Sequence, residues 1–271
     1  MHFHIITLFP EMFDSYLNES ILGRAIKNKK IKITFVNPRK FVTGKYKKVW
    51  PDGNVSLQVD DRPYAGGPGM VMRAEPVLKA VENVTKKILH PTLRCPPYRS
   101  STPFGYFDYK DISKGFTVGS LTQPHLKRGI KPKILIINFI PNAEKFDTKV
   151  AKNFAKKYTD IIMICGRYEG IDARVDKILR QAQDKFCKFK KISIGNYVLT
   201  GGEIPAMILI DCISRQIEGV LGNFDSREEE RVSTSEVYTR PEIIIYNKKK
   251  YKVPAVLLSG DHKKIEKWKM R

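Results

Sequence analysis

Three short stretches combine glycine with polar side chains in a way that suits ligand binding. They are "NFIPNA" (138–143), "ICGRYEGID" (164–172) and "VLTGGEIP" (198–205), and each follows an apolar, strand-like run. Adjacent glycines such as Gly201 and Gly202 let the backbone approach a flat ligand and present N–H and C=O groups to its edge. An adenine ring needs one such donor beside one such acceptor. A tight turn alone is an equally good explanation of the two glycines.

A fourth glycine-rich stretch, "DDRPYAGGPGM" (60–70), does not have the pattern of a phosphate-binding loop. The chain contains no G-x-x-x-x-G-K-[ST] and no G-x-G-x-x-G between a strand and a helix. The usual dinucleotide-binding sites are therefore excluded, and a nucleotide-like ligand would have to be held by the other loops.

The charge of the chain points to a polyanionic partner. Its 49 Lys and Arg against 28 Asp and Glu give a formal net charge of +21. Nucleic acid is the leading candidate for such a partner, and a lysine-rich surface that serves only solubility is the alternative. With 42% hydrophobic residues the chain can still bury a large core.

The four cysteines form no C-x-x-C pair, which argues against a disulfide framework or a zinc site. Cys165 and Cys212 lie in apolar runs and are expected in the core. The N-terminus lacks the pattern of a signal peptide, and no apolar run reaches the length of a membrane span. We expect a cytoplasmic protein without membrane contact.

Apolar runs and amphipathic segments alternate along the chain. Strands are predicted at 2–9, 31–36, 133–141 and 160–166, and helices at 11–28, 74–89, 145–158 and 204–219. Continuous apolar strands between helices predict an α/β fold with a mostly parallel sheet and helices on both faces. The carboxyl ends of parallel strands meet at one edge, so the three glycine turns are expected to form one crevice. Three segments break the rhythm and are predicted to be surface insertions or flexible loops, near 50–58, 90–132 and 180–191.

The motifs of this chain together resemble one family, the TrmD family of tRNA (guanine-N(1))-methyltransferases, which have the SPOUT fold. The resemblance spans nearly the whole chain and is carried by "LFPEMF", "GRAIKN", "VDDRPYAGGPGM", "ICGRYEGIDARV", "SIGNYVLTGGEIPAMILID", "SRQIEGVLGN", "YTRPE" and "VPAVLLSGDH". It implies a deep C-terminal trefoil knot, an exception to the rule that chains do not knot. It also implies a homodimer and a tRNA substrate with guanosine at positions 36 and 37, methylated at N(1) of guanosine 37.

The same resemblance divides the chain into a SPOUT methyltransferase domain (1–222), a flexible active-site linker (223–240) and a short basic segment (241–271). Because the sequence ends soon after Trp268, the last segment is expected to be a truncated remnant of the family's helical RNA-binding domain.

S-adenosylmethionine is the cofactor that the resemblance implies. Its predicted binding residues are Phe139, Pro141, Asn142, Gly166, Arg167, Tyr168, Gly170, Ile194, Gly195, Tyr197, Leu199, Gly201 and Gly202. The family's usual serine-proline-x-glycine is Ile140-Pro141-Asn142-Ala143 here, which alters one side of the expected pocket.

The reaction requires a base for the proton on guanine N(1) and a donor for the charge on the exocyclic oxygen. By resemblance the donor is Arg215, for which a surface arginine at a helix C-terminus is the alternative. The base is Glu230 where the family has aspartate, and Glu229 and Asp225 remain alternatives.

Glu169 is expected near the methionine end of the cofactor, with a magnesium ion, because the family's transfer depends on magnesium. A salt bridge to Arg167 or Arg174 is the alternative, and no residue is assigned as a metal ligand. Two other functions stay open: a knotted RNA-binding protein with impaired catalysis, and a SPOUT methyltransferase with a different RNA target.

Overall fold

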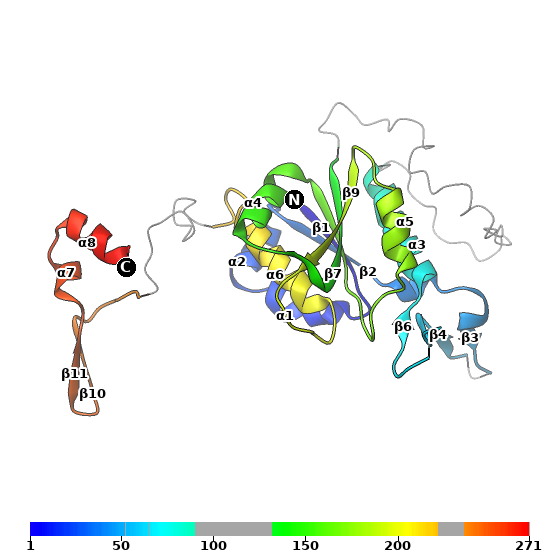
Figure 1. The fold of residues 1–271 in the computed structure, drawn as a ribbon, viewed down its shortest axis with the longest axis horizontal. Coiled ribbons are helices and arrows are strands. Elements are labelled where there is room, and N and C mark those ends of the chain that lie inside the picture. Colours follow the sequence, from blue (N-terminus) through cyan, green and yellow to red (C-terminus); the bar gives the residue numbers. More distant parts are fainter. Residues whose placement is uncertain (52, 65, 90–131, 222–235, 271) are drawn as a thin grey trace. The chain divides into compact units, whose positions relative to one another are not determined.

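A five-stranded parallel sheet forms the centre of the compact unit Met1–Val220 (Figure 1). The computed structural model describes residues 1–51, 53–64, 66–89, 132–221 and 236–270. The strand order is β2-β1-β8-β7-β9, and all four neighbouring pairs are parallel. The strands are β1 (His2–Ile6), β2 (Lys32–Val36), β7 (Ile134–Lys145), β8 (Asp160–Ile164) and β9 (Cys187–Ser193). The prediction of an α/β fold with a parallel sheet is confirmed.

Helices cover both faces of this sheet, as predicted (Figure 1). One face packs against α1 (Asp14–Leu17), α2 (Ser20–Lys27), α4 (Thr148–Lys157) and α6 (Glu203–Ser214). The other packs against α3 (Ala74–Leu89) and α5 (Arg174–Gln181). Along β8, Ile161 and Met163 point to the first core, and Ile162 and Ile164 point to the second. Burial of both faces is the reason why this strand is apolar throughout.

Short elements connect these layers. The helical stretch expected at 11–28 divides into the 3-10 helix η1 (Pro10–Phe13), α1 and α2. The remaining short elements before the third helix are η2 (Pro38–Phe41), η3 (Gly44–Tyr46), β3 (Lys47–Val49), β4 (Val55–Leu57), β5 (Asp60–Asp61) and β6 (Val71–Met72).

The three segments predicted as insertions or flexible loops have different outcomes. Segment 50–58 contains β4, which pairs with β3 in an antiparallel surface hairpin. For 180–191 the prediction is wrong, because this segment contains the end of α5 and most of β9, with Cys187 and Phe189 buried. It looked polar because lysines alternate with these buried residues on an edge strand. Residues 90–131 lie outside the described part of the chain.

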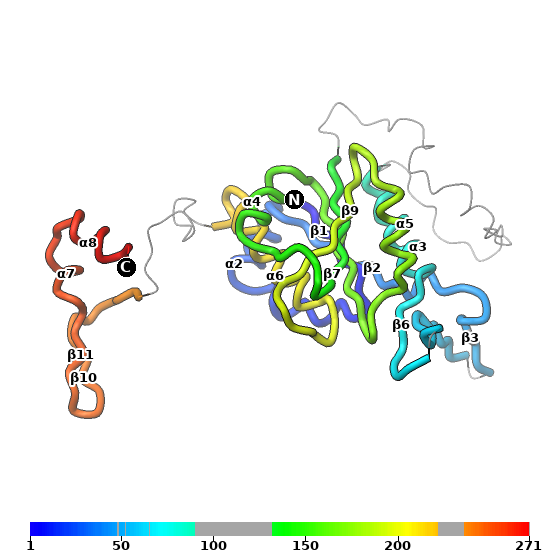
Figure 2. Tube along the Cα trace, in the orientation of Figure 1, coloured from blue at the N-terminus to red at the C-terminus, as the bar shows by residue number. Residues whose placement is uncertain are grey.

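The chain divides into two compact units, Met1–Val220 and Leu221–Arg271. The second contains the antiparallel hairpin of β10 (Ile243–Tyr246) and β11 (Lys249–Lys252), followed by α7 (Ala255–Leu258) and α8 (His262–Lys269) (Figure 2). Asn247 and Lys248 both have positive φ, as the tight turn of a two-residue hairpin requires. Every residue from 236 to 270 is exposed or half-buried. The last part of the predicted basic segment (241–271) forms α8.

Among the described residues, the structure contains no helix with both the length and the apolar character needed to cross a membrane.

Candidate active site

A pocket of about 330 Å³ lies at the carboxyl ends of β8 and β9 and at residues 138–141 within β7, the strand between them. Its size is within the range of small-molecule sites. The three glycine turns meet there as the sequence predicts. All of the expected cofactor-binding residues except Asn142 line the pocket: Phe139, Pro141, Gly166, Arg167, Tyr168, Gly170, Ile194, Gly195, Tyr197, Leu199, Gly201 and Gly202.

The first of these turns is a bulge inside a strand rather than a loop after it. Phe139 and Glu144 both pair with Ile192 of β9, so the residues between them leave the ladder. Bulges of this kind commonly redirect side chains next to active sites. Asn142 lies in the bulge, is exposed, and is not part of the pocket lining.

The two adjacent glycines are required by contacts inside the protein. A Cβ on Gly202 would lie 2.6 Å from Cα of Cys165, and the Gly202 amide donates a 3.0 Å hydrogen bond to the Gly166 carbonyl. A Cβ on Gly201 would lie 2.5 Å from Glu203 Oε2 and 2.6 Å from Arg167 Nε. Gly202 has φ of −85°, a conformation open to any residue, so the turn itself does not call for glycine there. Both glycines bring the turn after β9 against the turn after β8.

A buried carboxylate lies beneath this contact. Glu203, at the start of α6, is 1% exposed and accepts a 2.8 Å hydrogen bond from the Thr7 hydroxyl. Its Oε2 lies 3.0 Å from Arg167 Nε, but the atoms are not aligned for a hydrogen bond, so the contact is an ion pair alone. The Arg167 guanidinium also lies 4.7 Å from the centre of the Phe9 ring. The pair therefore links the turn after β8 to the end of β1 and to α6.

The role of Glu203 was not predicted from the sequence. A possible signal is its position directly after two glycines, where a long side chain at a helix N-terminus can fold back over them. Nothing in the sequence names Arg167 as its partner.

The glycine-rich stretch at 60–70, which lacks the pattern of a phosphate-binding loop, packs against one of the turns that line this pocket. The Glu169 amide donates to the Met70 carbonyl (3.0 Å), and the Met72 amide donates to the Gly170 carbonyl (2.9 Å). A Cβ on Gly69 would lie 2.5 Å from the Glu169 carboxylate. Glycine here thus allows the 66–72 segment to press against the turn that carries Glu169.

Glu169 itself lines the pocket, with an exposed side chain. The two arginines considered as its alternative partners form ion pairs elsewhere, Arg167 with Glu203 and Arg174 with Asp172 (2.6 Å). The hydrogen bond from Arg174 holds the pKa of Asp172 below its usual value.

Arg215, the predicted hydrogen-bond donor, does not line the pocket. Arg215 caps the C-terminus of α6, where its amide donates to the Asp211 carbonyl, and it is half-buried. Glu230 and the alternatives Glu229 and Asp225 lie outside the described residues. The pocket therefore unites the cofactor-binding predictions and Glu169, but it does not include Arg215.

Cys165 lies directly against Gly202 but is not a nucleophile in this state. Burial raises the pKa of its thiol well above the ordinary value, and the charge of Glu203 acts in the same direction. A neutral thiol packed in the core contributes contacts rather than covalent chemistry.

Together these features define a class: α/β proteins that bind a ligand in a crevice outside the carboxyl ends of parallel strands. Comparison with known proteins then narrows the class. The model of the family described as tRNA (Guanine-1)-methyltransferase TrmD matches residues 1–100 and 120–271. The chain therefore belongs to this family of tRNA (guanine-N(1))-methyltransferases.

Individual relatives show similarity over most of their length. The tRNA (guanine-N(1)-)-methyltransferase of Ruminiclostridium cellulolyticum is 38% identical over 275 residues, which covers 100% of this chain and 90% of the relative. The enzyme of the same name from Clostridioides difficile is 37% identical, with 99% and 90% covered. That from Buchnera aphidicola is also 37% identical, with 99% and 88% covered. A methyltransferase needs a methyl donor, and membership in this family implies S-adenosylmethionine.

Proposed function

We propose that this chain transfers a methyl group from S-adenosylmethionine to N(1) of guanosine 37 in tRNAs with guanosine at positions 36 and 37. This nucleotide stands next to the anticodon. The crevice built from three turns carries the proposal, because it gathers nearly every residue that the family resemblance assigns to the cofactor. Family membership supplies the class of reaction.

The residues of the crevice fit the cofactor in size and in chemistry. The pocket volume of about 330 Å³ is at the lower end of the range for small-molecule sites. The turns at Gly166 and at Gly201–Gly202 supply backbone groups for the adenine edge, and Glu169 supplies a carboxylate for the positively charged methionine end. When bound, S-adenosylmethionine supplies a methyl group that its sulfonium already activates.

The protein's own task is then to handle the proton and charge of the guanine. In the proposal, the Glu230 carboxylate accepts the N(1) proton as the new N–C bond forms. The Arg215 guanidinium donates a hydrogen bond to the exocyclic oxygen, where negative charge develops. Glu229 and Asp225 are the alternative bases.

We further propose a homodimer with a trefoil knot in the methyltransferase domain and a magnesium ion near Glu169. The position of Arg215 supports the dimer, because it lies outside the crevice lining of its own chain. In the family an RNA site combines both subunits, so a second copy would complete the site.

The second unit is proposed to grip the tRNA backbone. Lysines 248–250 lie at the tip of the β10–β11 hairpin and at the start of β11, and lysines 263–264 lie in the first turn of α8, all of them exposed. Exposed lysines of this density suit phosphate contacts, which strengthen binding without reading sequence. Neutralising all five should lower tRNA affinity and flatten its dependence on salt; unchanged affinity would remove this part of the proposal.

The central experiment uses purified protein, labelled S-adenosylmethionine and two transcripts that differ only in guanosine or adenosine at position 37. Label should enter the guanosine transcript alone. Equal labelling of both transcripts would favour a different RNA target. Failure to bind S-adenosylmethionine in calorimetry would favour the RNA-binding protein with impaired catalysis.

Two variants test the assigned roles. Arg215→Ala should lower the methylation rate by about 10²–10³-fold, the effect of losing a donor to developing charge. Glu230→Gln should lower it by about 10²–10⁴-fold, the range for a lost general base. Glu229→Gln is the matched control. If it loses the rate and Glu230→Gln keeps it, the base is Glu229.

A further inference from the structure

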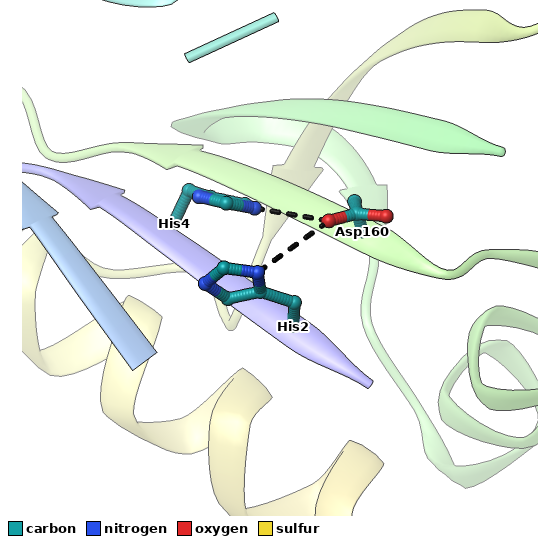
Figure 3. A group of neighbouring side chains, drawn as sticks. All are labelled: His2, His4 and Asp160. Atoms are coloured by element: carbon teal, nitrogen blue, oxygen red, sulfur yellow. Dashed lines mark hydrogen bonds and ion pairs between the residues drawn. The ribbon is translucent and has the colours of Figure 1, made fainter. Parts of the chain in front are cut away.

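Two histidines and an aspartate meet at the end of the sheet opposite the crevice (Figure 3). His4 Nε2 lies 3.0 Å from Asp160 Oδ1, and His2 Nδ1 lies 3.7 Å from the same oxygen. One ligand atom from each residue lies within 4.8 Å of the others. In the part of the chain that the structure describes, no other group of three such side chains is this close.

The strands bring these residues together by their register. His2 and His4 are two positions apart on β1, so their side chains point to the same face of the sheet. His2 pairs with Asp160 across the neighbouring strand β8. Ile6 and Ile162, which share this parity, belong to the core under α3 and α5, so the group lies on that face.

The donor geometry is close to that of a tetrahedral metal site. Metal bonds of about 2.0–2.2 Å place neighbouring ligand atoms roughly 3.3–3.5 Å apart. The observed distances of 3.0 and 3.7 Å from Asp160 Oδ1 to the two imidazole nitrogens bracket this value. Small movements of the side chains would therefore admit an ion.

A second contact fixes which nitrogen of His2 faces the group. His2 Nε2 lies 2.8 Å from the Thr34 hydroxyl, which leaves Nδ1 toward Asp160. Metal-binding histidines commonly hold their other nitrogen in such a hydrogen bond.

Burial of the group is intermediate, so water can reach a fourth coordination position. His4 is 5% exposed, and the side chains of His2 and Asp160 are 25% and 13% exposed. Two imidazoles with a carboxylate favour borderline ions such as Zn²⁺ over Mg²⁺, which prefers oxygen ligands.

We propose that His2, His4 and Asp160 form a Zn²⁺ site with water as the fourth ligand, joining β1 to β8. Without the ion, His4 and Asp160 keep their hydrogen bond. When zinc occupies His4 Nε2, the proton of that ring resides on Nδ1. The site is separate from the methyl-transfer crevice, because Asp160 lies at the beginning of β8 and the turn after the other end of this strand lines the crevice.

The test titrates untagged, chelator-treated full-length protein with Zn²⁺ by calorimetry and records the melting temperature with and without the ion. One ion should bind per chain and raise the melting temperature as its concentration increases. Replacing Zn²⁺ with Co²⁺ should give the visible absorption of a tetrahedral site.

Two variants and one control separate this site from adventitious binding. His2→Gln and Asp160→Asn should each weaken Zn²⁺ binding by at least about tenfold and abolish the thermal shift. His262→Gln, which changes an exposed histidine on α8, should leave both unchanged. Wild-type binding in both site variants would overturn the proposal, as would the absence of stoichiometric Zn²⁺ binding by the wild-type protein.

Discussion

The two ends of strand β8 make their contacts by opposite means. At its carboxyl end the contact depends on missing side chains, because Gly202 allows backbone to lie against Cys165 and Gly166. At its amino end the contact depends on side chains, because Asp160 accepts hydrogen bonds from His4 and Thr159. The first end forms a crevice for a ligand, and the second ties strands together.

This difference determines how each end responds to substitution. A glycine packed against backbone has no alternative arrangement, since neither partner can move aside. A polar group at a partly exposed strand end can exchange one partner for another or for water. Changes at the carboxyl end should therefore affect both folding and cofactor binding, whereas changes at the amino end should affect stability and zinc binding but leave cofactor binding unchanged.

The largest effect is expected for Gly202→Ala. Its Cβ would lie 2.6 Å from Cys165 Cα, so the two turns must separate. We expect a loss of about 3 kcal/mol in the free energy of unfolding, the upper range for overpacking. S-adenosylmethionine binding should become undetectable. Urea unfolding and calorimetry measure the two effects.

Gly44→Ala is the matched control for this substitution. Gly44 has φ of +66° with nothing near the added Cβ, so only backbone conformation is tested. Its expected cost is about 1 kcal/mol, without a change in cofactor affinity. If Gly202→Ala were no worse than Gly44→Ala, close approach of the two turns would not be what selects glycine.

A smaller effect is expected for Glu203→Gln. The amide can still accept from Thr7, but the buried charge opposite Arg167 is lost. We expect a cost of about 1–3 kcal/mol in unfolding free energy, and roughly tenfold weaker S-adenosylmethionine binding, because the turn at Arg167 is held less firmly.

Glu144→Gln is the control, since the ion pair of Glu144 with Lys190 is exposed and should be worth less than about 1 kcal/mol. Equal destabilisation by the two variants would mean that the buried pair has no special role at the crevice.

The difference between buried and partly exposed elements also explains which strands and helices the sequence could predict. Apolar runs identified β7 and β8, because both faces of a central parallel strand are buried. Edge strand β9 was missed because Lys188 and Lys190 alternate with buried residues. Helix α5 was missed because only Val175 and Leu179 mark its buried side. Two or three apolar positions among charged residues are too few to predict a helix or a strand.

Some features of the sites could be predicted from the sequence and others could not. Glycine turns are visible locally, so the crevice was anticipated. The partners of Glu203 are not, because Thr7 and Arg167 are 196 and 36 positions away. Nor is the His2–His4–Asp160 group, which depends on a strand register that pairs positions 158 apart. Long-range register is a property of the packed sheet rather than of any segment.

The smallest effect is expected for Asp160→Asn in metal-free protein. This variant should lower stability without lowering cofactor affinity, and so distinguish the amino end of β8 from its carboxyl end. The asparagine side chain has only one oxygen that can accept a hydrogen bond. One of the two hydrogen bonds that His4 and Thr159 make to the carboxylate is therefore lost or weakened. Because the strand end is partly exposed, we expect a loss of about 1–2 kcal/mol in unfolding free energy. S-adenosylmethionine affinity should stay within about twofold of wild type, since β8 remains paired along its length. A large loss of cofactor affinity would mean that the two ends of the strand are coupled, and that side chains at the amino end help to position the glycine turns at the other.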